Sequence, residues 1–208
     1  MDKLLCSERP IWTFPQQVFV VSDLHLGGRG PYFQNGRPVP DFRMCGVVGQ
    51  RKLTNFIREI VQKAHRKELP AHLVINGDFI DFLAEEESPG DGNFAAFTEN
   101  EETAQKKLVR ILEQPSESTE EEPIRDGNHG CKEFFDALAN FVQTPGTYLT
   151  ILLGNHDLEL SWPEVRKGLA NRLGAAHGSV YISTDGLPLI VGDLYIDHGN
   201  RSDTWNRG

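Results

Sequence analysis

The stretch QVFVVS, residues 17–22, is a β-branched and aromatic run that stops at a polar residue, Asp23. This composition predicts a short buried strand. A second apolar run, HLVIN at 72–76, stops in the same way at a Gly-Asp pair. Between the two runs, residues 51–67 carry apolar side chains at helical spacing and predict an amphipathic helix. A strand, a helix and a strand in this order predict a βαβ unit with parallel strands.

The rest of the chain continues this alternation and indicates an α/β fold. Residues 27–50 are rich in Gly, Pro and Arg and predict a loop, and residues 114–129 are acidic and predict an exposed linker. Helices are expected from about residue 99, where Thr98 is the expected cap, from near Cys131, and over 162–173. Strands are expected over 148–153, 179–183 and 188–199, the last folded into a hairpin at Gly192-Asp193.

Composition limits the classes of function that fit the chain. Its 208 residues suit one domain, and 21 basic against 30 acidic residues give a net charge of −9. Stable nucleic-acid binding is therefore not expected, because it requires a basic surface. The three Cys residues form no CxxC pair, and no apolar run is long enough for a signal peptide or a transmembrane helix. A cytoplasmic protein is the expectation.

Three of the predicted strands end in polar residues of similar type. The segments are SDLH at 22–25, NGD at 76–78 and GNHD at 154–157. Ligands of α/β sheets bind at the carboxyl ends of the strands, so these segments are expected to converge on one edge. A fourth segment, DHG at 197–199, ends a later apolar strand.

The residue types in these segments are those of a metal site. Asp23 and His25 alternate along an extended chain and reach the same side. Gly77 permits close backbone approach, and the two oxygens of Asp78 can bridge two cations. Taken alone, SDLH is better explained by a loop histidine and NGD by a capping aspartate, whereas a solvated turn explains GNHD equally well. Together, their Asp, His and Asn donors suit Mn²⁺, iron or Zn²⁺ rather than a thiolate-bound metal.

In this order, SDLHLG (22–27), NGDFID (76–81), GNHD (154–157) and DHG (197–199) resemble the calcineurin-like metallophosphoesterase family. The resemblance extends from about residue 17 to 203. It implies an α/β fold in which helices flank a central β-sandwich. It also implies a single domain over 1–208, in which residues 84–147 form a helical cap-like insert that contains the linker 114–129.

The resemblance also implies roles for individual residues. Two divalent metal ions, with Mn²⁺ expected and iron or Zn²⁺ as alternatives, would be held by Asp23, His25, Asp78, Asn155 and His198. Of these, Asp78 would bridge the two ions. His156 would contact the phosphate as general acid, and Asp81 would orient His156.

The implied activity is hydrolysis of a phosphomonoester, phosphodiester or pyrophosphate bond by a water molecule that two metal ions activate. GDFIDFL and GNHD lack the arginine that protein phosphatases of this family carry in the first of these motifs, which disfavours that subfamily. A phosphorylated small molecule or a lipid-linked compound is the expected substrate, with a UDP-diacylglucosamine-type pyrophosphate as the alternative. Loop arginines 29, 37, 43 and 201 are candidate phosphate contacts, although a solvated surface role is favoured for each alone.

One family motif has no counterpart here. The family carries a G-H-x-H segment after the position of His198, but residues 199–208 contain no histidine. Each metal would then lack one imidazole, and we expect the chain to be a C-terminally truncated version of a longer protein. A split gene, or substitute ligands from His129 or His177, are the alternatives, and a solvated loop histidine is favoured for both residues. A non-catalytic family member that binds metal weakly or acts as a binding module is the competing function.

Overall fold

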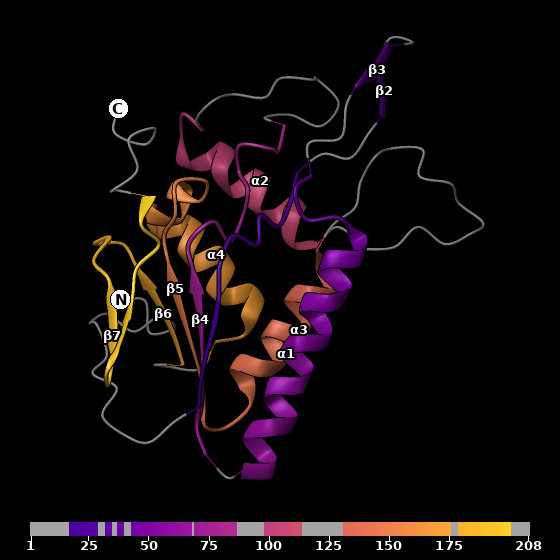
Figure 1. Cartoon of the computed structure of the whole chain (residues 1–208). Helices are drawn as coiled ribbons and strands as arrows, with labels where there is room; N and C mark the ends of the chain where they lie inside the picture. The colour runs from indigo at the N-terminus through magenta and orange to yellow at the C-terminus, as the bar shows by residue number, and fades with distance from the viewer. Residues whose placement is uncertain are drawn as a thin grey trace, which may run out of the picture.

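The computed structural model describes residues 17–28, 32–34, 37–39, 43–67, 69–86, 98–113, 131–175 and 179–200. Strands and helices alternate along the described chain and form layers around one parallel sheet (Figure 1). The elements are β1 (Gln17–Val21), β2 (Tyr32–Gln34), β3 (Arg37–Val39), α1 (Val47–Lys67), β4 (Ala71–Asn76), α2 (Glu101–Glu113), α3 (Lys132–Gln143), β5 (Thr147–Leu152), the 3-10 helix η1 (Leu158–Ser161), α4 (Pro163–Leu173), β6 (Val180–Ser183), β7 (Leu189–Val191) and β8 (Leu194–Ile196).

The central sheet has four parallel strands in the order β1-β4-β5-β6. The βαβ unit predicted from the sequence is confirmed, because β1 and β4 pair in parallel on either side of α1 in the chain. The register aligns Val21 with Ile75 and Asn76 with Leu152. Strands β1, β4 and β5 therefore end at one level, and the polar segments that follow them start side by side.

The main hydrophobic core lies between this sheet and the four helices. Strand β4 is buried on both faces of the sheet, because its side chains point alternately to one face and the other. Leu73 and Ile75 belong to the helix-side core, whereas Val74 packs on the opposite face. On α3, Phe134 and Phe135 are fully buried in the helix-side core and pack against Phe79 beyond the end of β4. Burial of these aromatic rings fixes the segment after β4 against the helical layer.

The second face of the sheet is covered in part by the β7–β8 hairpin (Figure 1). Its turn lies at Gly192-Asp193, as predicted, since Val191 pairs with Leu194. Leu189, Val191 and Ile196 pack against the sheet as a separate apolar cluster. A parallel sheet with helices on one face and this hairpin on the other agrees with the predicted α/β class, and a complete β-sandwich stays a prediction.

Three local predictions need correction or restriction. The first helix begins at Val47 rather than at residue 51, and the segment predicted as loop contains the β2–β3 pair. Helix α2 is capped by the Asn100 side chain, which accepts the backbone N–H of Thr103 at 2.9 Å, and not by Thr98. Helices α2 and α3, both inside 84–147, contribute to the helix-side core, and the linker 114–129 lies outside the described residues. None of the described helices is long and apolar enough to span a membrane.

His72, on β4, gives the stability of the sheet a pH dependence. The side chain is fully buried, and its Nε2 lies 2.8 Å from Thr150 Oγ1 on β5. Burial lowers the pKa of His72 from 6.5 to about 4. The unfolded chain therefore takes up this proton first as the pH falls. The contribution of neutral His72 to stability is complete above about pH 6.5 and is lost progressively down to about pH 4, by about 3 kcal/mol at most.

We predict that His72→Gln, which keeps a hydrogen-bonding group near Thr150, removes this part of the pH dependence. Urea unfolding of both proteins at intervals between pH 7.5 and 4 measures the effect. The free energy of unfolding of the native protein should fall more steeply with decreasing pH than that of the variant. Parallel curves for the two proteins would contradict the assignment.

Candidate metal centre

The segments after β1 and β4 are joined by backbone hydrogen bonds beyond the ends of the strands. The N–H of His25 donates to the carbonyl of Asp78 at 2.8 Å, and the N–H of Leu26 donates to that of Phe79 at 2.9 Å. In return, the N–H of Asp81 donates to the carbonyl of Leu26 at 2.9 Å. These backbone hydrogen bonds alone hold the SDLH segment (22–25) against the NGDFID segment (76–81).

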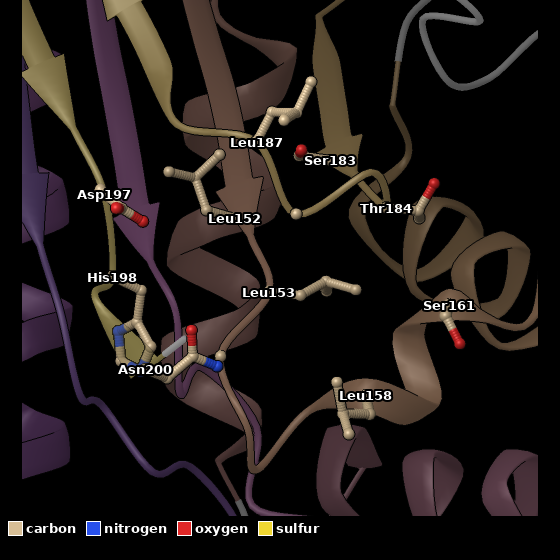
Figure 2. A pocket seen from close by; sticks show the side chains of 12 residues that line it. Leu152, Leu153, Leu158, Ser161, Ser183, Thr184, Leu187, Asp197, His198 and Asn200 are labelled. Carbon is tan, nitrogen blue, oxygen red and sulfur yellow. The ribbon is translucent and has the colours of Figure 1, made fainter. Parts of the chain in front are cut away.

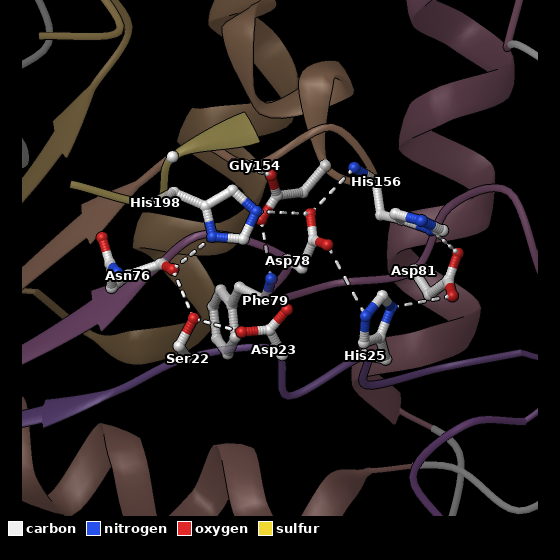
Figure 3. Close-up of polar contacts among 12 residues, drawn as sticks. Ser22, Asp23, His25, Asn76, Asp78, Phe79, Asp81, Gly154, His156 and His198 are labelled. Atoms are coloured by element: carbon white, nitrogen blue, oxygen red, sulfur yellow. Dashed lines mark hydrogen bonds and ion pairs between the residues drawn. The ribbon is translucent and has the colours of Figure 1, made fainter. Parts of the chain in front are cut away.

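Asp78 lies at the centre of the side chains that converge here (Figure 3). Its Oδ2 is 3.6 Å from His25 Nε2, and its Oδ1 is 3.5 Å from His198 Nε2. The backbone N–H of His156 donates to Oδ1 at 3.1 Å. One carboxylate therefore contacts residues from three separate polar segments.

Two groups of donor atoms share Asp78. One consists of His25, Asp78 and His156, and the other of Asp23, Asp78 and His198. Within each group the donor atoms lie within 4.8 Å of one another. Asp23 therefore lies with His198, and His156 lies with His25.

Asp81 contacts two histidines rather than one. Its Oδ1 is 3.2 Å from His156 Nδ1, and its Oδ2 is 3.2 Å from His25 Nδ1. The two imidazole rings meet edge to face, with their centroids 4.6 Å apart. A carboxylate at Nδ1 holds each ring so that Nε2 is directed away from Asp81.

On the other side of Asp78, the end of β4 positions His198 and Asp23. The Nδ1 atom of His198 lies 2.8 Å from the carbonyl oxygen of Asn76, so this nitrogen donates and Nε2 is left as the atom that faces Asp78. Ser22 Oγ lies 2.8 Å from the same carbonyl and contacts the Asp23 carboxylate. Asn155, the remaining predicted ligand, is half-buried and lines a neighbouring pocket.

Asp157 is a residue of the site to which the sequence assigned no role. It is fully buried, and its two oxygens accept the N–H of Phe79 at 2.8 Å and the N–H of Gly154 at 2.7 Å. It thus ties the segment after β4 to the segment after β5. Burial raises the pKa of Asp157 to about 7, against the two backbone hydrogen bonds that favour the carboxylate. The sequence feature that could have indicated a role for Asp157 is its position as the last residue of the GNHD motif.

The backbone at the centre is held in unusual conformations. Among the described residues, positive φ at non-glycine positions occurs at Asp23 (56°), His25 (42°) and Asp78 (49°), all predicted metal ligands. Such conformations cost about 1–3 kcal/mol each and persist where the surrounding structure enforces them. A Cβ atom at Gly154 would lie 2.0 Å from Asp78 Oδ1, so only glycine allows this approach.

Electrostatics link Asp78 and His198. Burial opposes ionisation of Asp78, but the hydrogen bonds from His198 and from the His156 backbone, with the charges of both histidines, lower its pKa to about 2. The hydrogen bond to Asp78 raises the pKa of His198. Near neutral pH, Asp78 is therefore an ionised and well-oriented carboxylate. Carboxylate and imidazole donors of this kind fit a borderline-to-hard divalent cation.

Pockets adjoin the centre on several sides. One is bounded by Asp197 and His198 at one end, and Figure 2 shows leucine side chains and hydroxyl groups lining the remainder. A second is lined by Asp23 and His25 together with apolar residues around the start of α1, among them Met44, Val48 and Leu53. A third begins at Asn155. The predicted substitute ligands His129 and His177 and the candidate phosphate contacts Arg29 and Arg201 lie outside the described residues, as does the side chain of Arg37, whereas Arg43 is half-buried.

A parallel α/β sheet with carboxylates and imidazoles gathered at the carboxyl ends of its strands defines a domain with a candidate metal-binding centre. The family model of calcineurin-like phosphoesterases matches residues 17–207, and the chain belongs to this family. The resemblance expected from the four motifs is thereby confirmed. Searches of curated proteins and of solved structures found no similar protein.

Proposed function

We propose that the chain is a metal-dependent phosphoesterase that hydrolyses a phosphomonoester, phosphodiester or pyrophosphate bond. The observation that carries the proposal is the position of Asp78, whose carboxylate is shared by both groups of donor atoms. A site for a single ion would not need two donor groups around one carboxylate. Family membership supports the hydrolytic class of the reaction.

The residues proposed to hold two divalent ions are those predicted from the sequence: Asp23, His25, Asp78, Asn155 and His198. When bound, such ions supply Lewis-acid stabilisation of phosphoryl charge and lower the pKa of a bound water molecule. Mn²⁺ is the proposed ion, with iron and Zn²⁺ as alternatives that the same donors accept. Because His156 lies in the same donor group as His25, experiment must decide whether it acts as a general acid or as a metal ligand.

In this proposal His156 protonates the oxygen of the leaving group. Its Nδ1 atom is held by Asp81 at 3.2 Å, so the proton to be transferred resides on Nε2. The side chain is 28% exposed, which allows contact with a substrate, whereas Asp81 is almost fully buried. Asp81 is thus a positioning residue that fixes the tautomer of His156.

The proposed substrate is a phosphorylated small molecule or a lipid-linked phosphoester. The apolar side chains of Met44, Val48 and Leu53 beside Asp23 and His25 support a substrate with an apolar part. A UDP-diacylglucosamine-type pyrophosphate is one such compound. An aryl phosphomonoester and an aryl phosphodiester serve as simple comparisons.

The test of the proposal is metal-dependent turnover. The purified chain is stripped with EDTA, dialysed, and assayed on the three substrate types with Mn²⁺, Fe²⁺ or Zn²⁺ added back. We expect no hydrolysis by the stripped protein and restored hydrolysis of at least one substrate type. No turnover with any metal and substrate would contradict the proposal and favour the non-catalytic alternative.

A further inference from the structure

The pocket that begins at Asn155, the residue before His156, has a volume of about 160 Å³. Its lining includes Leu83, Asn155, Leu158, Glu159, Ser161 and Trp162. Most of these residues come from the segment between β5 and α4, which includes η1. The segment that lines most of the pocket therefore follows directly on the GNHD motif in the chain. It is well placed to receive a part of the substrate other than the reacting phosphoryl group.

Glu159 distinguishes this pocket from the others. Its residue surface is only 7% exposed, and within the described ranges its carboxylate has no hydrogen-bond or ion-pair partner. Glu85 is a useful comparison, since it is 2% exposed and lies 3.0 Å from Arg110 Nε. Neither carboxylate oxygen of Glu159 is among the buried polar atoms of the described residues that lack a partner, so both remain open to the solvent of the pocket. Glu159 is therefore a group for which a ligand would supply the missing partner.

The chemistry of the pocket limits what this partner is. An ionised carboxylate only accepts hydrogen bonds, so the ligand must donate them. None of the described lining residues is Lys, Arg or His, and the neighbouring Arg166 donates to the carbonyls of Leu160 and Ser161 rather than to the Glu159 carboxylate. A cationic donor would both donate hydrogen bonds and balance the charge of the carboxylate, whereas a neutral hydroxyl group would do only the first. The leucine and tryptophan side chains provide an apolar surface for the hydrocarbon part of such a group.

We propose that Glu159 binds an ammonium group on the alcohol portion of the substrate, so that the enzyme prefers phosphoesters of amino alcohols. This inference rests on the proposed phosphoesterase function, because the pocket adjoins the catalytic segment. It adds a substrate class that the metal ligands do not determine. The net charge of −9 also favours approach of a cationic group.

The activity test compares 2-aminoethyl phosphate with 2-hydroxyethyl phosphate, which has nearly the same shape without the charge. For the native protein with Mn²⁺, we expect kcat/KM to be about tenfold or more higher for the amino compound. Glu159→Gln should abolish this preference and leave hydrolysis of the hydroxy compound unchanged. Glu102→Gln, an exposed residue of α2, removes the same charge elsewhere and should retain the preference.

A preference that is absent in the native protein, or that persists in Glu159→Gln, would overturn the inference while turnover itself still supported the phosphoesterase function. Thermal unfolding gives a test that needs no turnover. Glu159→Gln should be about as stable as the native protein, because the carboxylate has no partner in the described part of the chain that the substitution would remove. 2-Aminoethanol should raise the unfolding temperature of the native protein and not that of Glu159→Gln, with ethylene glycol inactive on both. Equal shifts in both proteins would overturn the inference even if no substrate were hydrolysed.

Discussion

Replacement of Asp78 by asparagine is expected to abolish metal-dependent phosphoester hydrolysis. The Asn side chain keeps the shape of Asp78 and can still accept the N–H of His156, but it removes the charge shared by both donor groups. Loss of metal-assisted charge stabilisation is worth several kcal/mol, so we expect kcat/KM to fall on the order of 10³-fold or more. Initial rates with saturating Mn²⁺ on the best substrate measure the effect.

The control for this variant is Asp193→Asn, in the exposed turn of the β7–β8 hairpin. It changes the net charge by the same amount and should retain full activity. Circular dichroism and thermal unfolding should show that Asp78→Asn remains folded. Native-like rates in folded Asp78→Asn would show that the shared carboxylate does not organise the reaction.

Replacement of His156 by glutamine is expected to lower kcat by about 10²–10⁴-fold, the usual contribution of general acid catalysis. The loss should be smaller for a p-nitrophenyl ester than for an alkyl ester, because a good leaving group needs less protonation. Rates for both esters, measured with the metal content of each sample, test this role. His65→Gln, at an exposed position of α1, is the matched control and should behave as the native protein.

The metal content decides between the two roles open to His156. Its ring lies with His25 and Asp78 in one donor group, so a ligand role is the structural alternative. If His156 is the general acid and not a metal ligand, His156→Gln should bind as much metal as the native protein. A loss of bound metal equal to the loss of activity would make His156 a ligand instead.

The sequence was sufficient to predict the part of the site that depends on strand ends. Runs such as QVFVV and HLVIN have the composition of buried strands, and parallel pairing of β1, β4 and β5 then brings Asp23, Asp78 and the GNHD segment to one edge. The motif order supplied the family, which the family model confirmed. These features depend on local periodicity and spacing, which a single sequence records.

What the sequence did not predict depends on contacts between distant segments. The pairing of Asp81 with both His25 and His156 joins three segments, because His25 lies 56 positions and His156 lies 75 positions from Asp81 in the chain. The burial of Asp157 and the isolation of Glu159 follow from packing that no local pattern encodes. Even the cap of α2 shifted to Asn100, because Thr98 and Asn100 are both good capping residues and only the helix start selects between them.

The central claim is that one carboxylate organises two metal ions, and the metal content of the purified chain tests it most directly. The stripped protein is dialysed against Mn²⁺, freed of unbound metal, and analysed for manganese per chain by elemental analysis, with Asp78→Asn treated identically. We expect two manganese ions per native chain and a clear loss from Asp78→Asn. One ion or none per native chain, or equal contents in the two proteins, would contradict it.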